Sequence, residues 1–221
     1  MDDAQVKSLS MGLSQKGVRD HNERLILSLI QRHGSLPGSA LAKLADLSPP
    51  TVSGILRQLE ADGLVERGTP VRGKVGKPSI PMGLAANGAF AFGIKIGRRS
   101  ADLILMDFKG GTRGEMQITY DFPIKQVVLT FLQDGLFNLA EQLSASEQAR
   151  ICGIGIAAPF EFWNWDASID APSNAFRAWS EVDLVAEVGE FSDLPVIVMN
   201  DATAACQAEH TYGRGKEFQD Y

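Results

Sequence analysis

The chain has 221 residues, of which 44% are hydrophobic and 22% charged, a composition ordinary for a globular protein that buries a core. This length admits two modest domains or one large one. No apolar run approaches the ~18 residues needed to cross a bilayer, and the first residues, MDDAQ, do not resemble a signal peptide. We therefore expect a cytoplasmic protein with no membrane partner.

The two cysteines, Cys152 and Cys206, lie far apart in the sequence. There is no CxxC motif and no closely spaced histidine pair, so the sequence offers no recognisable ligand set for zinc. We expect both cysteines to be buried, reduced thiols, with no disulfide and no metal site.

The net charge of −6 is unevenly distributed along the chain. Residues 1–80 hold 11 Lys and Arg against 8 Asp and Glu, whereas the remaining residues hold 10 against 19. A basic front on an acidic body indicates that a polyanionic partner would meet the N-terminal part.

The N-terminal part has the pattern of three short helices. Residues 1–17 are expected to be flexible, and a helix is predicted from "DHNERLILSLIQRHGSL", with Asn22 as a possible cap. A second helix is predicted in "PGSALAKLADL", with Leu41, Leu44 and Ala45 facing inward. A third follows Ser48 as N-cap, has Pro49 at its first position and runs to about Asp62.

The third helix carries an apolar stripe and an outward face of small polar residues. The stripe is formed by Val52, Ile55, Leu56 and Leu59. An ordinary amphipathic helix would also have a solvated face, but the order of the elements favours a winged helix-turn-helix over residues 18–82. We expect the third helix to enter the major groove of DNA, with contacts from Pro50, Thr51, Ser53 and Arg57.

The segment "GTPVRGKV" after this helix nearly spells a phosphate loop. Val75 stands where that loop needs Ser or Thr, and Pro78 and Pro81 prevent the helix that should follow. We interpret the segment as a glycine-rich wing that contacts phosphates or the minor groove through Arg72, Lys74 and Lys77.

After Pro81 the pattern becomes that of an α/β domain. Three strands are predicted in "FAFGIKIG", "ADLILMDF" and "GEMQITYDF", followed by a helix over about residues 124–144. Next come a buried strand in "ICGIGIAAPF", a helix in "WSEVDLVAEVGEF", a buried strand in "LPVIVMND" and a helix in "ATAACQAEHTYG". This order predicts parallel strands with polar residues at their carboxyl ends.

From about residue 18 to the end the chain resembles the ROK family, which contains bacterial sugar-responsive repressors and sugar kinases. The resemblance rests on the order and spacing of "TVSGILRQLEADGLVERG", "GKVGKPSIPMGL", "FGIKIGRRSADLILMDFKG", "GIGIAAPF" and "PVIVMNDATAACQAE". It implies that residues 83–221 form the first lobe of an actin-like, ribonuclease H-like domain.

The resemblance also implies that a phosphate site has been lost. In the kinases the first hairpin reads Asp-x-Gly-x-Thr, and the acid helps to place magnesium–ATP. Here Lys95 replaces the acid, Gly97 is retained, Arg98 follows, and Arg99 takes the hydroxyl position. Because lysine cannot ligate magnesium, we expect no kinase activity and no cofactor.

The resemblance implies that the sugar side of the site is partly retained. Asn200 and Asp201 end a predicted strand, match sugar-contacting positions, and Asp201 matches the catalytic base of the kinases. Asn174 matches a segment near the sugar less closely. The alternative for Asp201 is that it caps the following helix. Phe160 stands where the family has a glycine, so the floor of the pocket is altered.

The sequence stops before the family's Glu-x-Gly-His segment, zinc site and second lobe, so it is either a fragment or a short form that covers its exposed face by self-association. The preferred hypothesis is a transcriptional regulator, a repressor of carbohydrate genes, that forms a homodimer or higher oligomer. It would bind a palindromic operator and respond to a sugar or sugar phosphate. The alternatives are an ATP-dependent sugar kinase and a truncated DNA-binding protein with an inert C-terminal half.

Overall fold

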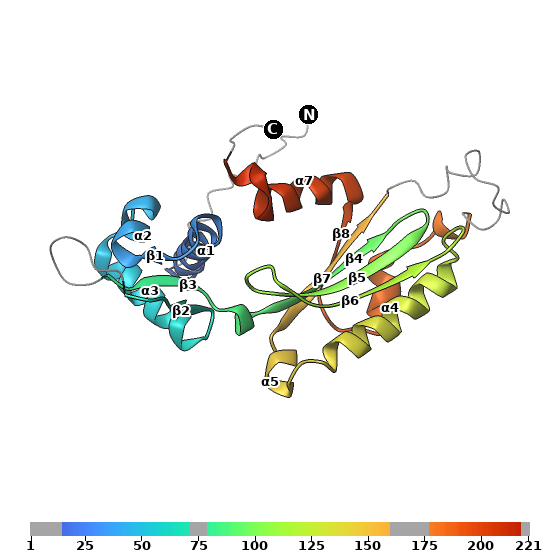
Figure 1. Cartoon of the computed structure of the whole chain (residues 1–221), viewed down its shortest axis with the longest axis horizontal. Helices are drawn as coiled ribbons and strands as arrows, with labels where there is room; N and C mark the ends of the chain where they lie inside the picture. Colours follow the sequence, from blue (N-terminus) through green and yellow to red (C-terminus); the bar gives the residue numbers. More distant parts are fainter. Residues whose placement is uncertain (1–14, 71–78, 160–176, 218–221) are drawn as a thin grey trace, which may run out of the picture. The chain divides into compact units, whose positions relative to one another are not determined.

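The computed structural model describes residues 15–70, 79–159 and 177–217 (Figure 1). The chain divides into two compact units, which we call the N-terminal unit and the C-terminal unit. The N-terminal unit comprises Met1–Ala61 and Val65–Gly83, and the C-terminal unit comprises Asp62–Leu64 and Leu84–Tyr221. No helix in the described part of the chain has both the length and the apolar character needed to cross a bilayer.

The N-terminal unit contains three helices and a small sheet. The helices are α1 (Gln15–His33), α2 (Gly38–Ala45) and α3 (Pro49–Ala61). The sheet has the order β1-β3-β2, with the strands β1 (Leu36–Pro37), β2 (Val65–Arg67) and β3 (Pro81–Leu84). The core is formed by fully buried aliphatic side chains from every helix, so each helix contributes an apolar face: Ile26, Ile30, Leu41, Val52 and Leu59.

The start of α3 has the predicted cap. The Thr51 backbone N–H donates to Ser48 Oγ at 3.3 Å, and the two hydroxyl oxygens lie 2.8 Å apart. Pro49 is the first helical residue, where its missing N–H leaves no bond unmade. The apolar stripe is buried as predicted, so the opposite side of α3 is exposed to solvent.

Two predictions for the first two helices are wrong. The first helix begins at Gln15, so Asn22 lies inside it and is not its cap. In α2, Leu44 is 50% exposed and Ala42 is buried beside Leu41. With 100° between successive residues, a helix that turns Leu41 and Ala42 inward must turn Leu44 away.

The C-terminal unit is built on a five-stranded sheet of order β6-β5-β4-β7-β8. The antiparallel strands are β4 (Phe90–Ile96), β5 (Ser100–Asp107) and β6 (Thr112–Thr119), and β7 (Ile151–Ala158) and β8 (Val196–Asn200) run parallel to β4. The helices are α4 (Lys125–Ala140), α5 (Ala145–Gln148), α6 (Leu184–Gly189) and α7 (Asp201–Tyr212). Single 3-10 turns occur at Ala86–Gly88, Arg177–Trp179 and Arg214–Glu217.

One face of this sheet, which we call the packed face, is covered by α4 and α6 (Figure 1). Alternate residues of β4, β5 and β7 point into a core that also holds Val128, Leu132 and Val188. The helix α4 lies close to β5, because a Cβ added at Gly135 would come within 2.5 Å of Leu103. The indole N–H of Trp179, also buried there, donates to the Pro123 carbonyl at 2.8 Å.

The opposite face, which we call the open face, is crossed by α7, a helix with no buried residue (Figure 1). The predicted burial of the last strand is therefore wrong: in β8, Ile197 is 67% exposed and Val198 is 38% exposed. The reason is its position, because β8 is an edge strand paired on one side only.

The two cysteines are also more exposed than predicted. Cys152 on β7 and Cys206 on α7 are both exposed, and the Cys152 thiol donates to the Phe90 carbonyl at 3.1 Å. The exposure of Cys206 follows from the loose packing of α7, because this helix buries none of its residues.

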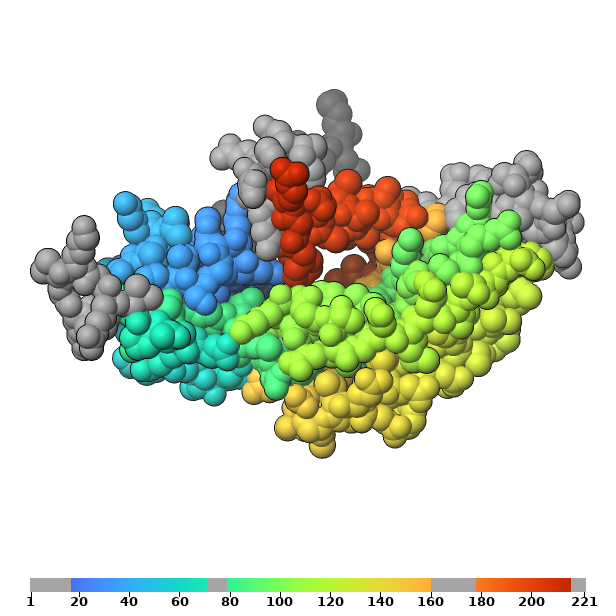
Figure 2. Space-filling view, in the orientation of Figure 1, coloured from blue at the N-terminus to red at the C-terminus, as the bar shows by residue number. Residues whose placement is uncertain are grey.

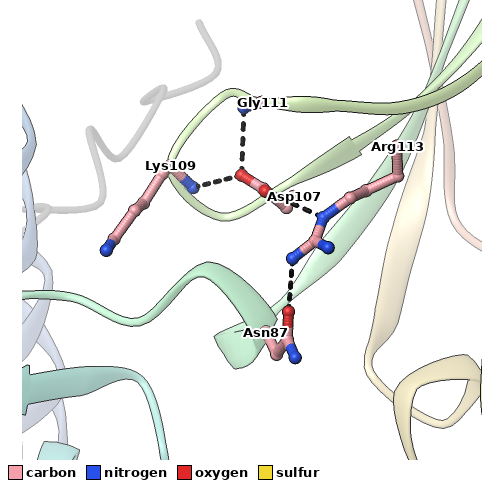
Figure 3. A network of polar contacts seen from close by, with 5 residues as sticks. All are labelled: Asn87, Asp107, Lys109, Gly111 and Arg113. Carbon is pink, nitrogen blue, oxygen red and sulfur yellow. Dashed lines mark hydrogen bonds and ion pairs between the residues drawn. The ribbon is translucent and has the colours of Figure 1, made fainter.

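The turn between β5 and β6 is organised by one carboxylate (Figure 3). Asp107 Oδ1 accepts the backbone N–H groups of Lys109 and Gly111 at 2.9 and 3.0 Å. Asp107 Oδ2 accepts from Arg113 Nε at 2.9 Å, and the same guanidinium donates to Asn87. Gly110 in this turn has a φ of 86°, and a side chain there would collide with the ring of Tyr212. Glycine at this position therefore allows the end of α7 to lie close to the turn.

Candidate functional site

The carboxyl ends of the parallel strands bring two of the predicted site segments to one edge of the sheet. Lys95 on β4 is in register with Ala157 on β7, which is in register with Met199, and Ala158 pairs with Asn200. The turn after β4 and the start of α7 are thus two strand spacings apart, roughly 10 Å. This is the edge at which open α/β sheets bind ligands.

The turn between β4 and β5, residues 97–99, is fixed by Tyr120, which directly follows β6. The Gly97 N–H donates to the Ser100 carbonyl at 2.8 Å, which closes the turn. The Tyr120 hydroxyl lies 2.8 Å from the carbonyl oxygens of both Gly97 and Ser100, to which it donates. Burial raises the pKa of Tyr120 well above its usual value, and the nearby charge of Asp102 adds to the shift, so the hydroxyl remains a donor.

One arginine of this turn is bonded within the protein, and the other is exposed. Arg99 Nη1 donates to the Asp121 carbonyl at 2.9 Å and lies 3.7 Å from Asp121 Oδ1. Arg98 and Lys95 are exposed. The loop keeps the shape of a tight hairpin turn, but its hydrogen bonds are used within the protein to join β4 and β5 to the end of β6.

A carboxylate that sequence reasoning missed lies directly opposite Lys95. Asp102 on β5 pairs with Lys95 in the antiparallel register. Its Oδ2 accepts from Ser100 Oγ at 3.2 Å, and its Oδ1 accepts from Gln117 Nε2. Counting outward from the turn would have found the pair, because opposed residues of a hairpin share one face. In the described part of the chain, no three His, Cys, Asp or Glu side chains gather as metal ligands.

Lys95 and Asp102 border a groove of about 540 Å³ between α7 and the open face. The space-filling view shows the hollow beneath α7 (Figure 2). Its floor is formed by small and aliphatic residues, because Gly93 and Gly155 carry no side chain. Polar groups from α7, namely Gln207, Thr211 and Tyr212, line it as well.

The start of α7 is capped by Asn200. Its Oδ1 accepts the backbone N–H groups of Ala202 at 3.1 Å and Thr203 at 3.3 Å. Asp201 is the first helical residue, and its Oδ1 also accepts from Ala202 N at 2.9 Å. The alternative in which Asp201 is the N-cap is therefore wrong, because Asn200 occupies that position. Asn174 and Phe160 lie outside the described residues.

The exposed side of α3 borders two grooves of the N-terminal unit. Ser53 and Arg57 line one of about 450 Å³, together with β2 and β3. Pro50, Thr51 and Gln58 line another of about 410 Å³, beside α1. The predicted contact residues thus lie on both flanks of α3, and their role in DNA binding stays a prediction. The predicted wing cations lie outside the described residues: Arg72, Lys74 and Lys77.

An ion pair that sequence reasoning missed joins the end of α3 to β2. Arg67 Nε donates to Glu60 Oε1 at 2.6 Å, and Nη2 donates to Oε2 at 3.0 Å. The hydrogen bond from Arg67 lowers the pKa of the Glu60 carboxyl below its usual value. Local sequence rules do not predict this pair, because its residues lie seven positions apart across a turn.

These features define a winged helix-turn-helix protein that carries an actin-like α/β lobe. A winged helix-turn-helix DNA-binding family matches residues 19–66, and the ROK family matches residues 91–221. The chain belongs to the ROK family.

Two of the relatives that the chain matches are named as xylose repressors, one of them as putative. The putative xylose repressor of Caldicellulosiruptor sp. (strain Rt8B.4) is 27% identical over 198 residues, covering 89% of this chain and 49% of the relative. The xylose repressor of Bacillus subtilis (strain 168) is 22% identical over 202 residues, covering 91% of this chain and 52% of the relative. The chain therefore spans about half the length of the curated relatives it matches.

A solved structure has the same fold. The crystal structure of a ROK family transcriptional regulator, a homologue of the E. coli MLC protein, matches with a TM-score of 0.59 and 21% identity. The match covers 88% of this chain and 49% of that one.

Proposed function

We propose that the protein is a DNA-binding transcriptional regulator, a repressor of genes for carbohydrate use. The observation that carries this proposal is the exposed face of α3, a capped helix whose Ser53 and Arg57 border a groove lined also by β2 and β3, in a chain that matches a winged helix-turn-helix DNA-binding family. Arginine can bond guanine through two hydrogen bonds in the major groove, and the short Ser53 allows the backbone to approach. The sugar repressors among its relatives support the same role.

The C-terminal unit would then act as a sensor without phosphoryl transfer. Lys95 is exposed where a magnesium-binding acid is required, and Tyr120 and Arg99 fix the adjacent turn from within the protein. Asn200 and Asp201 are the proposed contacts for a sugar or sugar phosphate. A homodimer bound to a palindromic operator would place two copies of α3 about one helical turn of DNA apart.

The first test is selection of genomic fragments bound by the full chain, followed by titration with one selected duplex. Arg57→Ala should weaken binding about 5- to 150-fold, because it removes a contact worth about 1–3 kcal/mol. The matched control is Arg98→Ala, which removes an exposed arginine from the C-terminal unit and should leave the affinity unchanged. Equal affinity of wild type and Arg57→Ala at moderate salt would exclude α3 as the reading helix.

The second test concerns the sensor. Asp201→Asn should abolish or reduce the effect of sugars on operator affinity while the affinity without sugar is unchanged. The control is Asp193→Asn, an exposed carboxylate before β8. A sugar-dependent turnover of ATP by the wild type would instead support the kinase alternative. Operator binding that no sugar changes would support an inert C-terminal half.

A further inference from the structure

The groove of about 450 Å³ that α3 shares with β2 and β3 is lined by one negatively charged and two positively charged side chains. Its charged lining residues are Arg57 and Glu60 on α3 and Arg67 on β2. Ser53, Arg57 and Glu60 follow each other at intervals of four and three residues, so they form one row along α3. The row that we propose for DNA contact therefore ends in a carboxylate.

That carboxylate is fully engaged by Arg67. Both of its oxygens accept from the guanidinium, at 2.6 and 3.0 Å, in the bidentate geometry that makes such pairs specific. The Arg67 side chain is nonetheless 62% exposed and that of Glu60 is 32% exposed. An exposed ion pair of this kind adds little to the free energy of unfolding. We therefore consider how the pair changes the charge that this surface presents to DNA.

The effect on DNA follows from charge. Lys and Arg side chains attract the phosphate backbone without regard to sequence, and each phosphate contact releases counterions. Two of the five N–H groups of Arg67, on Nε and Nη2, are already bonded to Glu60, and the Glu60 charge beside the remaining ones offsets the attraction of the guanidinium for a phosphate and repels the backbone. Within the part of the chain that the structure describes, no hydrogen bond or ion pair joins Glu60 to Arg57, which lies one turn earlier on the same row.

We propose that Glu60 is a specificity-determining residue that holds Arg67 away from the DNA backbone and so lowers sequence-independent affinity. This inference rests on the proposed DNA-binding function and deepens it. Glu60 leaves Arg57 to read bases, while Arg67 contributes no phosphate contact of its own.

The test compares the full chain on a random-sequence duplex and on a selected operator, over about 50 to 200 mM salt. Glu60→Gln should raise affinity for the random duplex about 3- to 10-fold. It should also make the slope of log K against log salt more negative by about 0.9, the value for one added phosphate contact. The ratio of specific to random affinity should fall accordingly.

Two further variants separate this role from others. Glu60→Gln combined with Arg67→Gln should return both the random affinity and the slope to wild-type values, because the released cation is then absent. Glu115→Gln removes the same charge from an exposed position on β6 and should change neither quantity. Thermal melting of each variant checks that the fold is retained.

The outcomes are distinct. An unchanged slope for Glu60→Gln overturns the inference, as does a fall in affinity for both duplexes at constant slope, which would mean that the pair only supports the wing. A double variant that retains the raised affinity also overturns it. If the wild type binds no duplex, the proposed function itself fails, whereas failure of the variants on a DNA-binding wild type leaves that function standing.

Discussion

The two faces of the five-stranded sheet differ, although the same strands form both: one face is a buried core and the other borders a groove. On the packed face, alternate side chains of β4, β5 and β7 are buried under α4 and α6. On the open face, the intervening positions include Gly93 and Gly155, and α7 lies over them without burying a residue of its own. Stability is therefore concentrated on one side, and the other side retains the groove and the polar groups around it.

The largest effect is expected from truncation on the packed face. Leu132 on α4 is 0% exposed, so Leu132→Ala removes buried methyl groups and leaves a cavity. We expect a loss of about 2–5 kcal/mol in the free energy of unfolding, measured by urea titration. A loss below about 1 kcal/mol would contradict the assignment of this face as the core.

A smaller loss is expected where α4 approaches β5. In Gly135→Ala the new methyl group would come within 2.5 Å of a terminal methyl group of Leu103, which is itself fully buried. Overpacking of this kind costs about 1–3 kcal/mol and exceeds the gain in helix propensity of up to about 1 kcal/mol. The control is Gly54→Ala in α3, where no atom lies within 4 Å, so stability should rise instead.

A substitution that weakens the turn between β4 and β5 should have an intermediate effect on the free energy of unfolding. Tyr120→Phe removes the donor to the Gly97 and Ser100 carbonyls, and we expect a loss of about 0.5–1.5 kcal/mol in the urea titration. Tyr212→Phe is the matched control, because in the part of the chain that the structure describes the Tyr212 hydroxyl makes no hydrogen bond and the residue is 49% exposed. Equal effects of the two variants would show that the Tyr120 bonds do not support the turn.

The smallest effect is expected on the open face. Ile197 is 67% exposed, so Ile197→Ala should change the free energy of unfolding by no more than about 0.5 kcal/mol. A loss comparable to that of Leu132→Ala would mean that the open face is covered in solution, which analytical ultracentrifugation of both proteins would then test.

Local patterns predicted most of the fold. Patterns among neighbouring residues predict the apolar stripe of α3, its Ser48 cap and the order of strands and helices. The structure confirms all three. The errors concern tertiary position: an apolar strand such as β8 looks the same whether it is central or at an edge, and Leu44 is apolar yet turned outward.

The candidate site divides in the same way. The carboxyl edge with Asn200 and Asp201 follows from parallel strands, and the loss of the acid at Lys95 is visible in the sequence. The hydrogen bonds from Tyr120 to Gly97 and from Arg67 to Glu60 cannot be predicted from the sequence, because they depend on which distant residues the fold brings together.

The capping of α7 by Asn200 determines which hydrogen-bonding groups of this side chain remain available to a ligand. Its carbonyl oxygen is already occupied by two backbone amides, so the remaining end of the amide can only give a proton, while its neighbour Asp201 can only receive one. For the sugar contact proposed above, one hydroxyl of the ligand would accept from the Asn200 amide and an adjacent hydroxyl would donate to Asp201, as a diol can. An anion with nothing to donate would meet the repulsion of the carboxylate.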